Sequence, residues 1–307
     1  MRYPNRIVIR EVSPRDGLQG EPTAISTDDK VRLVDLLSAS GVERVNATSF
    51  VSPRAVPQMA DAEQVMSRIE RRAGVVYDVS VPNQRGAARA VEAGADAIMV
   101  FVDASDEGNR RSVRRSTEES LAEAERLIAE TRARGVAVAG TVGMAFGSPY
   151  EGRIAPERVV RMARRMVAAG AGAIALGDTT GEASPRQVAE LISAVLEALP
   201  GVDLGLHFHD TRGLGMANVL AAMDAGATRF DASVGGIGGN PFLHNAAGNI
   251  CTEDLVHMCE EMGIATGLDL DVLVEANRFL ESLLGRPLPG KVAHAGRSRV
   301  PQILETA

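Results

Sequence analysis

The feature that most limits the fold of this chain is an alternation of short β-branched runs with longer amphipathic segments, repeated about eight times along 307 residues. The short runs have the length of strands, and the longer segments have the length of helices. Strands are expected at Ile7–Val12, Arg44–Thr48, Val75–Val81, Ala97–Val102, Val136–Val142, Ala173–Leu176, Asp203–Phe208 and Arg229–Ser233. Helices are expected at Thr27–Ser40, Asn83–Ala93, Thr117–Arg134, Pro156–Ala169, Ser184–Leu199 and Gly215–Ala225.

The residues between these segments support the alternation. Several predicted helices end in a small residue followed by Gly, as in Ser40-Gly41, and several begin with capping residues, as in Ser26-Thr27. Repeated strand–helix units predict a parallel sheet. Because the chain is long enough for eight units and no Gly-rich dinucleotide fingerprint follows the first strand, a (β/α)₈ TIM barrel is favoured over an open doubly wound sheet.

A C-terminal helical extension is expected after the eighth unit. The segments Asn245–Met262 and Leu268–Leu284 have helical patterns. From Arg286 onward the chain is rich in Pro, Gly and Arg. We therefore expect one catalytic domain over residues 1–290 and a tail, residues 291–307, that is mobile in part.

Composition and charge narrow the possible functions. A formal net charge of -7 disfavours non-specific nucleic-acid binding, and no apolar run is long enough to span a bilayer. The chain enters a predicted strand within MRYPNRIVIREV, so no signal or transit peptide is expected. Cys251 and Cys259 do not form a pair of metal-binding motifs, and a reducing cytoplasm is the expected location.

Two histidines mark the end of the seventh predicted strand. Catalytic residues of a TIM barrel lie at the C-terminal ends of its strands. His207 and His209 are two residues apart, so both are expected on the same side of the strand, at the barrel mouth. Two imidazoles on one face suit a divalent metal, although a single buried His is more often a hydrogen-bonded core residue.

Acidic residues follow two other strands. Arg15 and Asp16 lie in a Gly-bounded loop after the first strand, where they form either a functional cation–anion pair or a local salt bridge. Asp178 follows the sixth strand and is either a rim carboxylate or a turn residue. The pattern alone leaves both choices open.

A glycine-rich segment, residues 235–249, follows the eighth strand and ends at Asn249, with Glu253 shortly after it. Its glycines and polar residues indicate a substrate loop more than a plain connection. Together with Asn249, the residues Asp16, His207 and His209 offer two oxygen and two nitrogen ligands. This mixture suits Mg²⁺ or Mn²⁺, with Zn²⁺ or Co²⁺ as alternatives.

These motifs, in this order, resemble the 3-hydroxy-3-methylglutaryl-CoA lyase family of metal-dependent TIM-barrel lyases and aldolases. The resemblance implies that Asp16, His207, His209 and Asn249 bind the metal and that Arg15 is an essential arginine. It also implies acidic active-site residues at Asp178 and Glu253, a CoA thioester substrate and a homodimer or higher homo-oligomer. The matching stretches are Pro14-Arg15-Asp16-Gly17-Leu18-Gln19, Ala47-Thr48-Ser49-Phe50-Val51-Ser52-Pro53, Val56-Pro57-Gln58-Met59, Pro149-Tyr150-Glu151-Gly152, Leu176-Gly177-Asp178-Thr179, His207-Phe208-His209-Asp210-Thr211, and Gly248-Asn249 with Thr252-Glu253-Asp254-Leu255.

Two positions depart from the family pattern. Asn240 stands where the family has a catalytic Cys, and Asn46 stands where it has a Glu. An amide cannot exchange a proton near neutral pH. We hypothesise that His244, in the same loop, supplies the proton instead; the alternative is that His244 is an ordinary solvated loop residue. The residues expected to contact the substrate are Arg15, Gln19, Asn46, Ser49 and Asn240.

The predicted activity is a metal-assisted retro-Claisen cleavage of a 3-hydroxyacyl-CoA to an acyl-CoA and a keto acid. His207 or Asp16 would remove the hydroxyl proton, and Arg15 would stabilise the enolate by its charge. One alternative is an aldolase acting on a 4-hydroxy-2-oxo acid, or an acyl-CoA condensing synthase. A second alternative is a metal-binding homologue that has lost catalysis.

Overall fold

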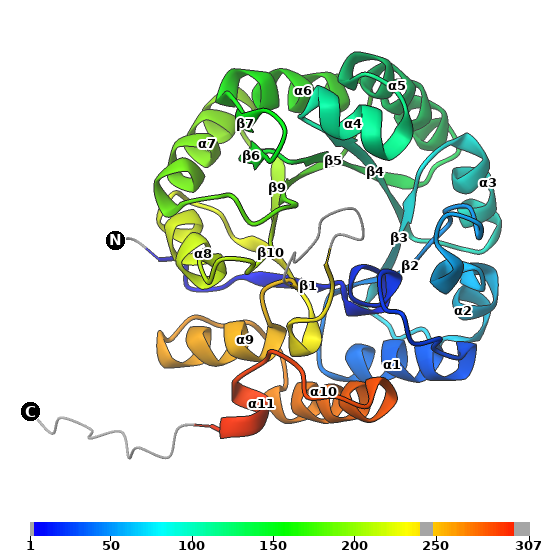
Figure 1. Ribbon diagram of the computed structural model, residues 1–307, viewed down its shortest axis with the longest axis vertical. Helices are drawn as coiled ribbons and strands as arrows, with labels where there is room; N and C mark the ends of the chain where they lie inside the picture. The colour runs from blue at the N-terminus through cyan, green and yellow to red at the C-terminus, as the bar shows by residue number, and fades with distance from the viewer. Residues whose placement is uncertain (1–2, 240–247, 298–307) are drawn as a thin grey trace, which may run out of the picture.

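The alternating segments form a closed barrel of eight parallel strands, as the sequence predicts (Figure 1). The computed structural model describes residues 3–239 and 248–297. Around the barrel the strand order is β1-β10-β9-β8-β5-β4-β3-β2. The strands are β1 Val8–Glu11, β2 Arg44–Ser49, β3 Val76–Val81, β4 Ala97–Asp103, β5 Ala137–Gly143, β8 Ala173–Asp178, β9 Asp203–Phe208 and β10 Arg229–Ala232.

Helices cover the outside of the barrel, and their ends follow the predicted capping signals. The Ser26 hydroxyl accepts a hydrogen bond from the backbone N–H of Asp29, and Ser116 forms a capping box with Glu119. Gly41 follows α1 with a φ of 87°, a conformation that favours glycine at a helix end. The predicted helices are α1 Thr27–Ala39, α3 Gln84–Glu92, α5 Thr117–Ala133, α6 Pro156–Ala168, α7 Pro185–Ala198 and α8 Gly215–Asp224.

Short elements at the ends of several strands were not predicted. The helix α4, Asp106–Val113, follows β4 and is mostly charged, so it lacks the apolar periodicity that identified the other helices. Another short helix, α2, spans Ala62–Arg68, and the strands β6, Gly147–Ser148, and β7, Gly152–Arg153, form a small hairpin. Single helical turns cover Ser13–Gly17, Pro57–Met59 and Val234–Gly236.

The predicted helix Asn245–Met262 is wrong at its beginning. Helix α9 spans only Thr252–Glu261, and residues 240–247 lie outside the described part of the chain. Before α9, Asn249 forms a β-bridge with His209, and Cys251 forms one with Ser233. Backbone hydrogen bonds to the ends of β9 and β10 therefore hold this stretch extended, and these tertiary contacts override its local helix propensity.

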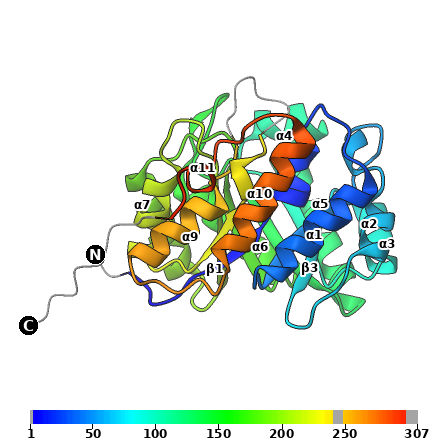
Figure 2. The same cartoon turned by 90° about the horizontal axis from the view of Figure 1, so that it is seen from below.

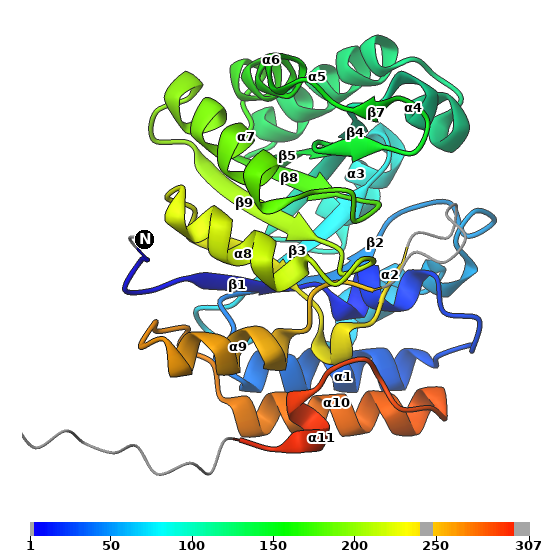
Figure 3. The same ribbon diagram turned by 60° about the vertical axis from the view of Figure 1, so that its left-hand side comes forward.

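The C-terminal helices pack beside α1 and complete the outer layer (Figures 2 and 3). Helix α10 spans Leu270–Leu284 and contacts both α1 and α9. A last short helix, α11, Val292–Ala295, begins inside the predicted tail and contacts α9 and α10. Among the described residues, no helix has the length and apolar character that a membrane span requires.

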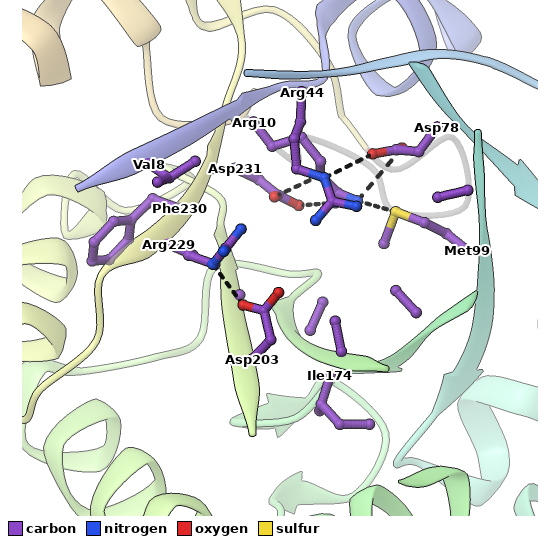
Figure 4. A pocket seen from close by; sticks show the side chains of 15 residues that line it. Val8, Arg10, Arg44, Asp78, Met99, Ile174, Asp203, Arg229, Phe230 and Asp231 are labelled. Atoms are coloured by element: carbon purple, nitrogen blue, oxygen red, sulfur yellow. Dashed lines mark hydrogen bonds and ion pairs between the residues drawn. The ribbon is translucent and has the colours of Figure 1, made fainter. Parts of the chain in front are cut away.

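The inside of the barrel contains charged side chains as well as an apolar core (Figure 4). Arg10 on β1 pairs with Asp231 on β10, and its guanidinium also lies 3.6 Å from Asp78 on β3. Nearer the start of the strands, Arg229 pairs with Asp203 at 2.6 Å. Small residues on the facing strands leave room for these long side chains, and they include Ala97, Ala139, Ala173, Ala175 and Gly205.

Candidate metal centre and active site

Three predicted metal ligands meet at the C-terminal mouth of the barrel. The ligand atoms of Asp16, His207 and His209 all lie within 4.8 Å of one another. His207 Nε2 is 3.1 Å from His209 Nε2 and 3.7 Å from Asp16 Oδ2. Three electron-pair donors that converge this closely are the arrangement that a divalent cation requires.

Asn249 completes the set and supplies a test of whether a cation fits. Its Nδ2 donates to Asp16 Oδ2 at 2.9 Å and to the Ile237 carbonyl at 3.1 Å. Its Oδ1 is buried and has no hydrogen-bond partner among residues 3–239 and 248–297. A buried amide oxygen without a partner costs about 1–3 kcal/mol. A cation bound by Asp16, His207, His209 and Asn249 would remove that cost, so these residues fit a divalent metal.

Local backbone structure brings these ligands together. After β1 the chain forms a tight π-helical turn, in which the N–H groups of Arg15, Asp16 and Gly17 all point to the Val12 carbonyl. A Cβ atom at Gly17 would lie 2.7 Å from the Ile237 side chain, so a larger residue there would force Ile237 of the eighth-strand loop to move. The β-bridge to His209 brings Asn249 to the same place.

Each side chain around Asp16 is held by a second contact. The guanidinium of Arg15 donates from Nη1 to Asp16 Oδ1 and from Nε to Asn46 Oδ1. Gln19 also donates to Asp16 Oδ1, at 2.9 Å. Burial would raise the pKa of Asp16, but Arg15 and the imidazole of His207 outweigh it and hold that pKa well below its usual range.

The other ring nitrogen of His207 contacts a carboxylate that was not predicted. His207 Nδ1 lies 3.1 Å from Asp231 Oδ2, and Arg10 Nε donates to Asp231 Oδ1 at 2.9 Å. Burial would raise the pKa of Asp231, but Arg10 and His207 lower it to about 2. An ionised Asp231 accepts a hydrogen bond from Nδ1–H of His207 and so leaves Nε2 without a proton, facing the metal position. The only sequence signal for it was an acidic residue inside a β-strand.

A cavity of about 270 Å³ opens beside the metal ligands. Three of the predicted substrate-contacting residues, Arg15, Gln19 and Ser49, line it. Its far wall includes Asp103, at the end of β4, and Thr141, on β5. Neither of these two was predicted, although Asp103 is another polar residue at the end of a strand.

Other predicted residues lie behind the cavity formed by the described residues. Asn46 is fully buried and links Arg15 to Asp78, donating to Asp78 Oδ1 at 2.6 Å. Asp178 accepts hydrogen bonds from the backbone N–H groups of Glu182 and Ala183, and burial raises its pKa to about 6. Both residues therefore support loops or other side chains from positions outside the cavity lining.

Two buried glutamates hold the loop after β10. Glu253 accepts hydrogen bonds from the Gly235 backbone N–H at 3.0 Å and from Asn277 at 2.7 Å, and burial raises its pKa. Glu11, which was not predicted, accepts from the Val234 N–H and from the Thr252 hydroxyl; burial raises its pKa to about 7. The sequence could not reveal that Glu11 holds this loop, because Glu11 and its partner Val234 are more than 200 positions apart and meet only in the folded barrel.

The two remaining predicted residues, Asn240 and His244, lie outside the described residues. Both cysteines, Cys251 and Cys259, are buried, and neither lines the cavity that the described residues form. The described part of the cavity wall therefore contains no thiol.

Comparison with known proteins gives a consistent set of relatives. Residues 6–280 match the HMGL-like family. The chain is 40% identical to hydroxymethylglutaryl-CoA lyase YngG of Bacillus subtilis, over 95% of this chain and 97% of that protein. It is 43% identical to (R)-citramalyl-CoA lyase of Chloroflexus aurantiacus, over 98% of each chain. Among solved structures, an HMG-CoA lyase from Acinetobacter baumannii in complex with coenzyme A and 3-methylmalate superimposes with a TM-score of 0.93 at 44% identity, covering 97% of this chain and 98% of that one.

Proposed function

The chain belongs to the HMGL-like family of carbon–carbon lyases, and on this basis we propose that it cleaves a 3-hydroxyacyl-CoA by a metal-assisted retro-Claisen reaction. The products would be an acyl-CoA and a keto acid. The observation that carries the proposal is the convergence of Asp16, His207 and His209 on one cavity that Arg15 also lines. The unpartnered Oδ1 of Asn249 supports the same position for the metal.

The four ligands would hold Mg²⁺ or Mn²⁺, with Zn²⁺ or Co²⁺ as alternatives. When bound, such a cation would supply Lewis-acid chemistry that lowers the pKa of the substrate hydroxyl. The protein then has to accept the hydroxyl proton. We propose His207 for this role over Asp16, both of whose oxygens already accept hydrogen bonds from Arg15, Gln19 and Asn249. Because His207 Nδ1–H donates to Asp231, the proton can be accepted only at Nε2, and in that step Asp16, His209 and Asn249 would hold the cation without His207.

Arg15 has the position and charge to stabilise the enolate that forms when the carbon–carbon bond breaks. It lines the cavity, and Asn46 and Asp16 fix its guanidinium from two sides. A preoriented cation of this kind stabilises developing negative charge without having to reorganise during the reaction. Asn46 therefore acts by positioning Arg15, and Asp178 and Glu253 act by holding the loops around the site.

Proton return to the enolate completes the reaction. The amide of Asn240 cannot supply this proton, and the prediction that His244 does so remains a prediction, since both residues lie outside the described part of the chain. Loss of turnover in His244→Ala would support it. Turnover near the wild-type rate would remove His244 from this role.

A screen of 3-hydroxyacyl-CoA thioesters with mass-spectrometric detection of products tests the proposed function. The names of the relatives put 3-hydroxy-3-methylglutaryl-CoA and (R)-citramalyl-CoA first in the screen. We expect acetyl-CoA and a keto acid from at least one thioester, and loss of activity after exhaustive chelation. Release of pyruvate from a CoA-free 4-hydroxy-2-oxo acid would favour the aldolase alternative. Metal binding without turnover of any compound would favour a homologue that has lost catalysis.

Two further expectations accompany this function. We propose a CoA thioester as the small-molecule partner and a homodimer or higher homo-oligomer as the assembly in the cytoplasm. Light scattering of the purified protein would test the assembly directly, since a monomer at micromolar concentration would contradict it.

A further inference from the structure

A second carboxyl group faces the same cavity from the opposite side of the barrel mouth. Asp103 is the last residue of β4, and β4 is separated from both β1 and β9 by two strands on either side. The residue is 4% exposed and lines the cavity together with Arg15 and His207. Its Oδ1 has no hydrogen-bond partner within residues 3–239 and 248–297.

The space around this carboxyl comes from its neighbour on β5. Asp103 pairs in register with Gly143, and a Cβ atom at Gly143 would lie 2.5 Å from Asp103 Oδ1. Phe101 would be in the way of the same Cβ atom. A glycine at position 143 therefore lets a full-sized acidic side chain stand at the cavity wall.

No charged group of the described residues compensates Asp103. From β5 it faces Thr141 and Gly143, and from α4 it faces Ser112, none of which carries a charge. The side chains that α5 buries are uncharged, and the cavity-lining residues of β3, Ser80 and Val81, are uncharged as well. The charged residues of α4 form exposed ion pairs with each other, and they are Asp106, Glu107, Arg110 and Arg111.

The ionisable groups on the other side of the cavity form hydrogen bonds and ion pairs with one another. They are Arg10, Arg15, Asp16, His207, His209 and Asp231. With desolvation as the main influence, burial raises the pKa of Asp103 to about 7. A carboxyl with such a pKa carries a proton for much of the time at neutral pH, and it can also give that proton up.

We propose that Asp103 is the acid that protonates the enolate carbon of the departing acyl-CoA. This inference rests on the proposed function and adds a residue to it. In the cavity wall formed by the described residues, Arg15 and the metal ligands lie on one side and Asp103 lies on the other. A thioester whose oxygen contacts Arg15 would place its α-carbon in the cavity between these two walls, and the Asp103 carboxyl lines that same cavity.

Protons and electrons balance in this step. When the carbon–carbon bond breaks, its electron pair passes into the thioester and forms the enolate. The enolate pair then takes the proton of the Asp103 carboxylic acid and forms the new C–H bond, which leaves Asp103 as a carboxylate. The proton that His207 took from the hydroxyl goes to solvent, and Asp103 regains one from solvent before the next turnover.

The variant Asp103→Asn tests the proposal because it keeps the shape and removes the acid. We expect kcat to fall about a hundredfold or more while KM and metal content stay near their wild-type values. The alkaline limb of the kcat profile, where wild-type activity falls as the pH rises through about 7, should disappear. Asp103→Glu should recover part of kcat, and Glu107→Gln, which alters an exposed carboxyl of α4, serves as the matched control.

A second readout avoids the cleavage reaction. In D₂O the metal-loaded wild-type enzyme should exchange the methyl protons of acetyl-CoA, since the same acid acts in reverse as a base. Asp103→Asn, or Asp103→Ser if the amide variant does not fold, should lose this exchange. The proposal is overturned if a folded variant keeps both kcat and exchange, if only KM changes, or if His244→Ala alone loses the exchange. A wild-type enzyme that neither cleaves any thioester nor exchanges acetyl-CoA would refute the proposed function itself, and this inference with it.

Discussion

The two walls of the active-site cavity both contain buried aspartates, but the pKa values of these aspartates are shifted in opposite directions. On the side of β1, β9 and β10, Asp16 and Asp231 are surrounded by donors and cations, and both have pKa values below the usual range. On the side of β4 and β5, Asp103 has neither a cation nor a partner for Oδ1 in the described ranges, and its pKa rises to about 7. All three are buried aspartates at or near the C-terminal ends of strands.

This contrast shows that neighbours, more than residue type or burial, decide what a strand-end carboxylate can do. Burial acts on all three in the same direction, since desolvation disfavours the charged form. Only where Arg10, Arg15 and His207 supply positive charge or hydrogen bonds does the ionised form win. One wall is therefore suited to hold a cation, and the other is suited to hold a proton.

Interior contacts connect the residues of the first wall, which is the side of the cavity formed by β1, β9 and β10. Arg10 contacts Asp231, which orients His207, and Arg10 also lies next to Asp78 (Figure 4). Asp78 in turn accepts from Asn46, the residue that holds Arg15. The proposed base and the proposed enolate-stabilising arginine are thus tied to one network inside the barrel, whereas Asp103 stands apart from it.

Removing the central carboxylate of the first wall should have the largest effect. Asp16→Asn deletes a metal ligand and the negative charge that faces Arg15, so we expect kcat/KM to fall by about 10⁴-fold, the upper range for loss of a group engaged in proton transfer and metal binding. Metal content should fall in parallel, as measured by plasma mass spectrometry. Asp203→Asn, at the other end of the barrel, is the control. Full metal content with full activity in Asp16→Asn would contradict the ligand assignment.

Next in size is the loss of the arginine. Arg15→Gln removes the charge that stabilises the enolate and should lower kcat by about 10²- to 10³-fold. Because Arg15 acts on the reacting charge, KM should change much less than kcat. A variant that binds metal normally and loses affinity for the thioester, with kcat intact, would assign Arg15 to substrate binding instead. Steady-state kinetics on the best thioester of the screen distinguishes the two results.

The sequence predicted the barrel, and it placed two of the proposed metal ligands side by side, because both features depend on local spacing. Strand–helix alternation fixes the fold, and a two-residue separation places His207 and His209 on one side of a strand. Asn249 was included among the expected ligands although a helix was wrongly predicted around it; a β-bridge to His209 fixes that residue instead. Spacing along the chain was sufficient for the barrel and the two histidines, whereas the position of Asn249 depends on a contact between distant segments.

Spacing along the sequence could not predict which hydrogen-bond or charge partners a buried polar residue has. Asp178 was expected to be either a rim carboxylate or a turn residue, and the resemblance implied an active-site role for Glu253. Backbone N–H groups of neighbouring loops bind both carboxylates behind the cavity. Asp231 and Asp103 acquire their properties from other strands, through Arg10 in the first case and through the space above Gly143 in the second. These contacts depend on the closed barrel, so they become visible only with the structure.

Asp103 should also destabilise the folded protein near neutral pH, which gives a third effect, on the free energy of unfolding. Its folded-state pKa of about 7 lies above the value of about 3.9 for an unfolded chain. The folded carboxyl keeps its proton where the unfolded one loses it, so stability falls as the pH rises from about 4 to about 7 and stays lowered above that. In urea titrations at pH 8 we expect Asp103→Asn to be more stable than the wild type by roughly 4 kcal/mol. At pH 4 the two should nearly coincide; a variant that is less stable at pH 8 would mean that Asp103 has a stabilising partner.

The smallest effect sharpens the comparison by weakening the first wall without removing a ligand. Asp231→Asn keeps the shape but loses the charge that fixes the His207 tautomer, and loss of such a partner typically lowers metal affinity by about 10- to 100-fold. Competition with a chelator of known affinity measures the change, and Asp203→Asn, whose carboxylate pairs with Arg229 near the strand starts, should leave affinity unaltered. Asp231→Asn should also be less stable than the wild type at pH 8, opposite in sign to Asp103→Asn. The stabilisation that Asp231 supplies is present above the unfolded value near 4 and is lost as the pH falls toward its folded pKa of about 2. If both variants shifted stability in the same direction, the two walls would not differ in the way that their contacts indicate.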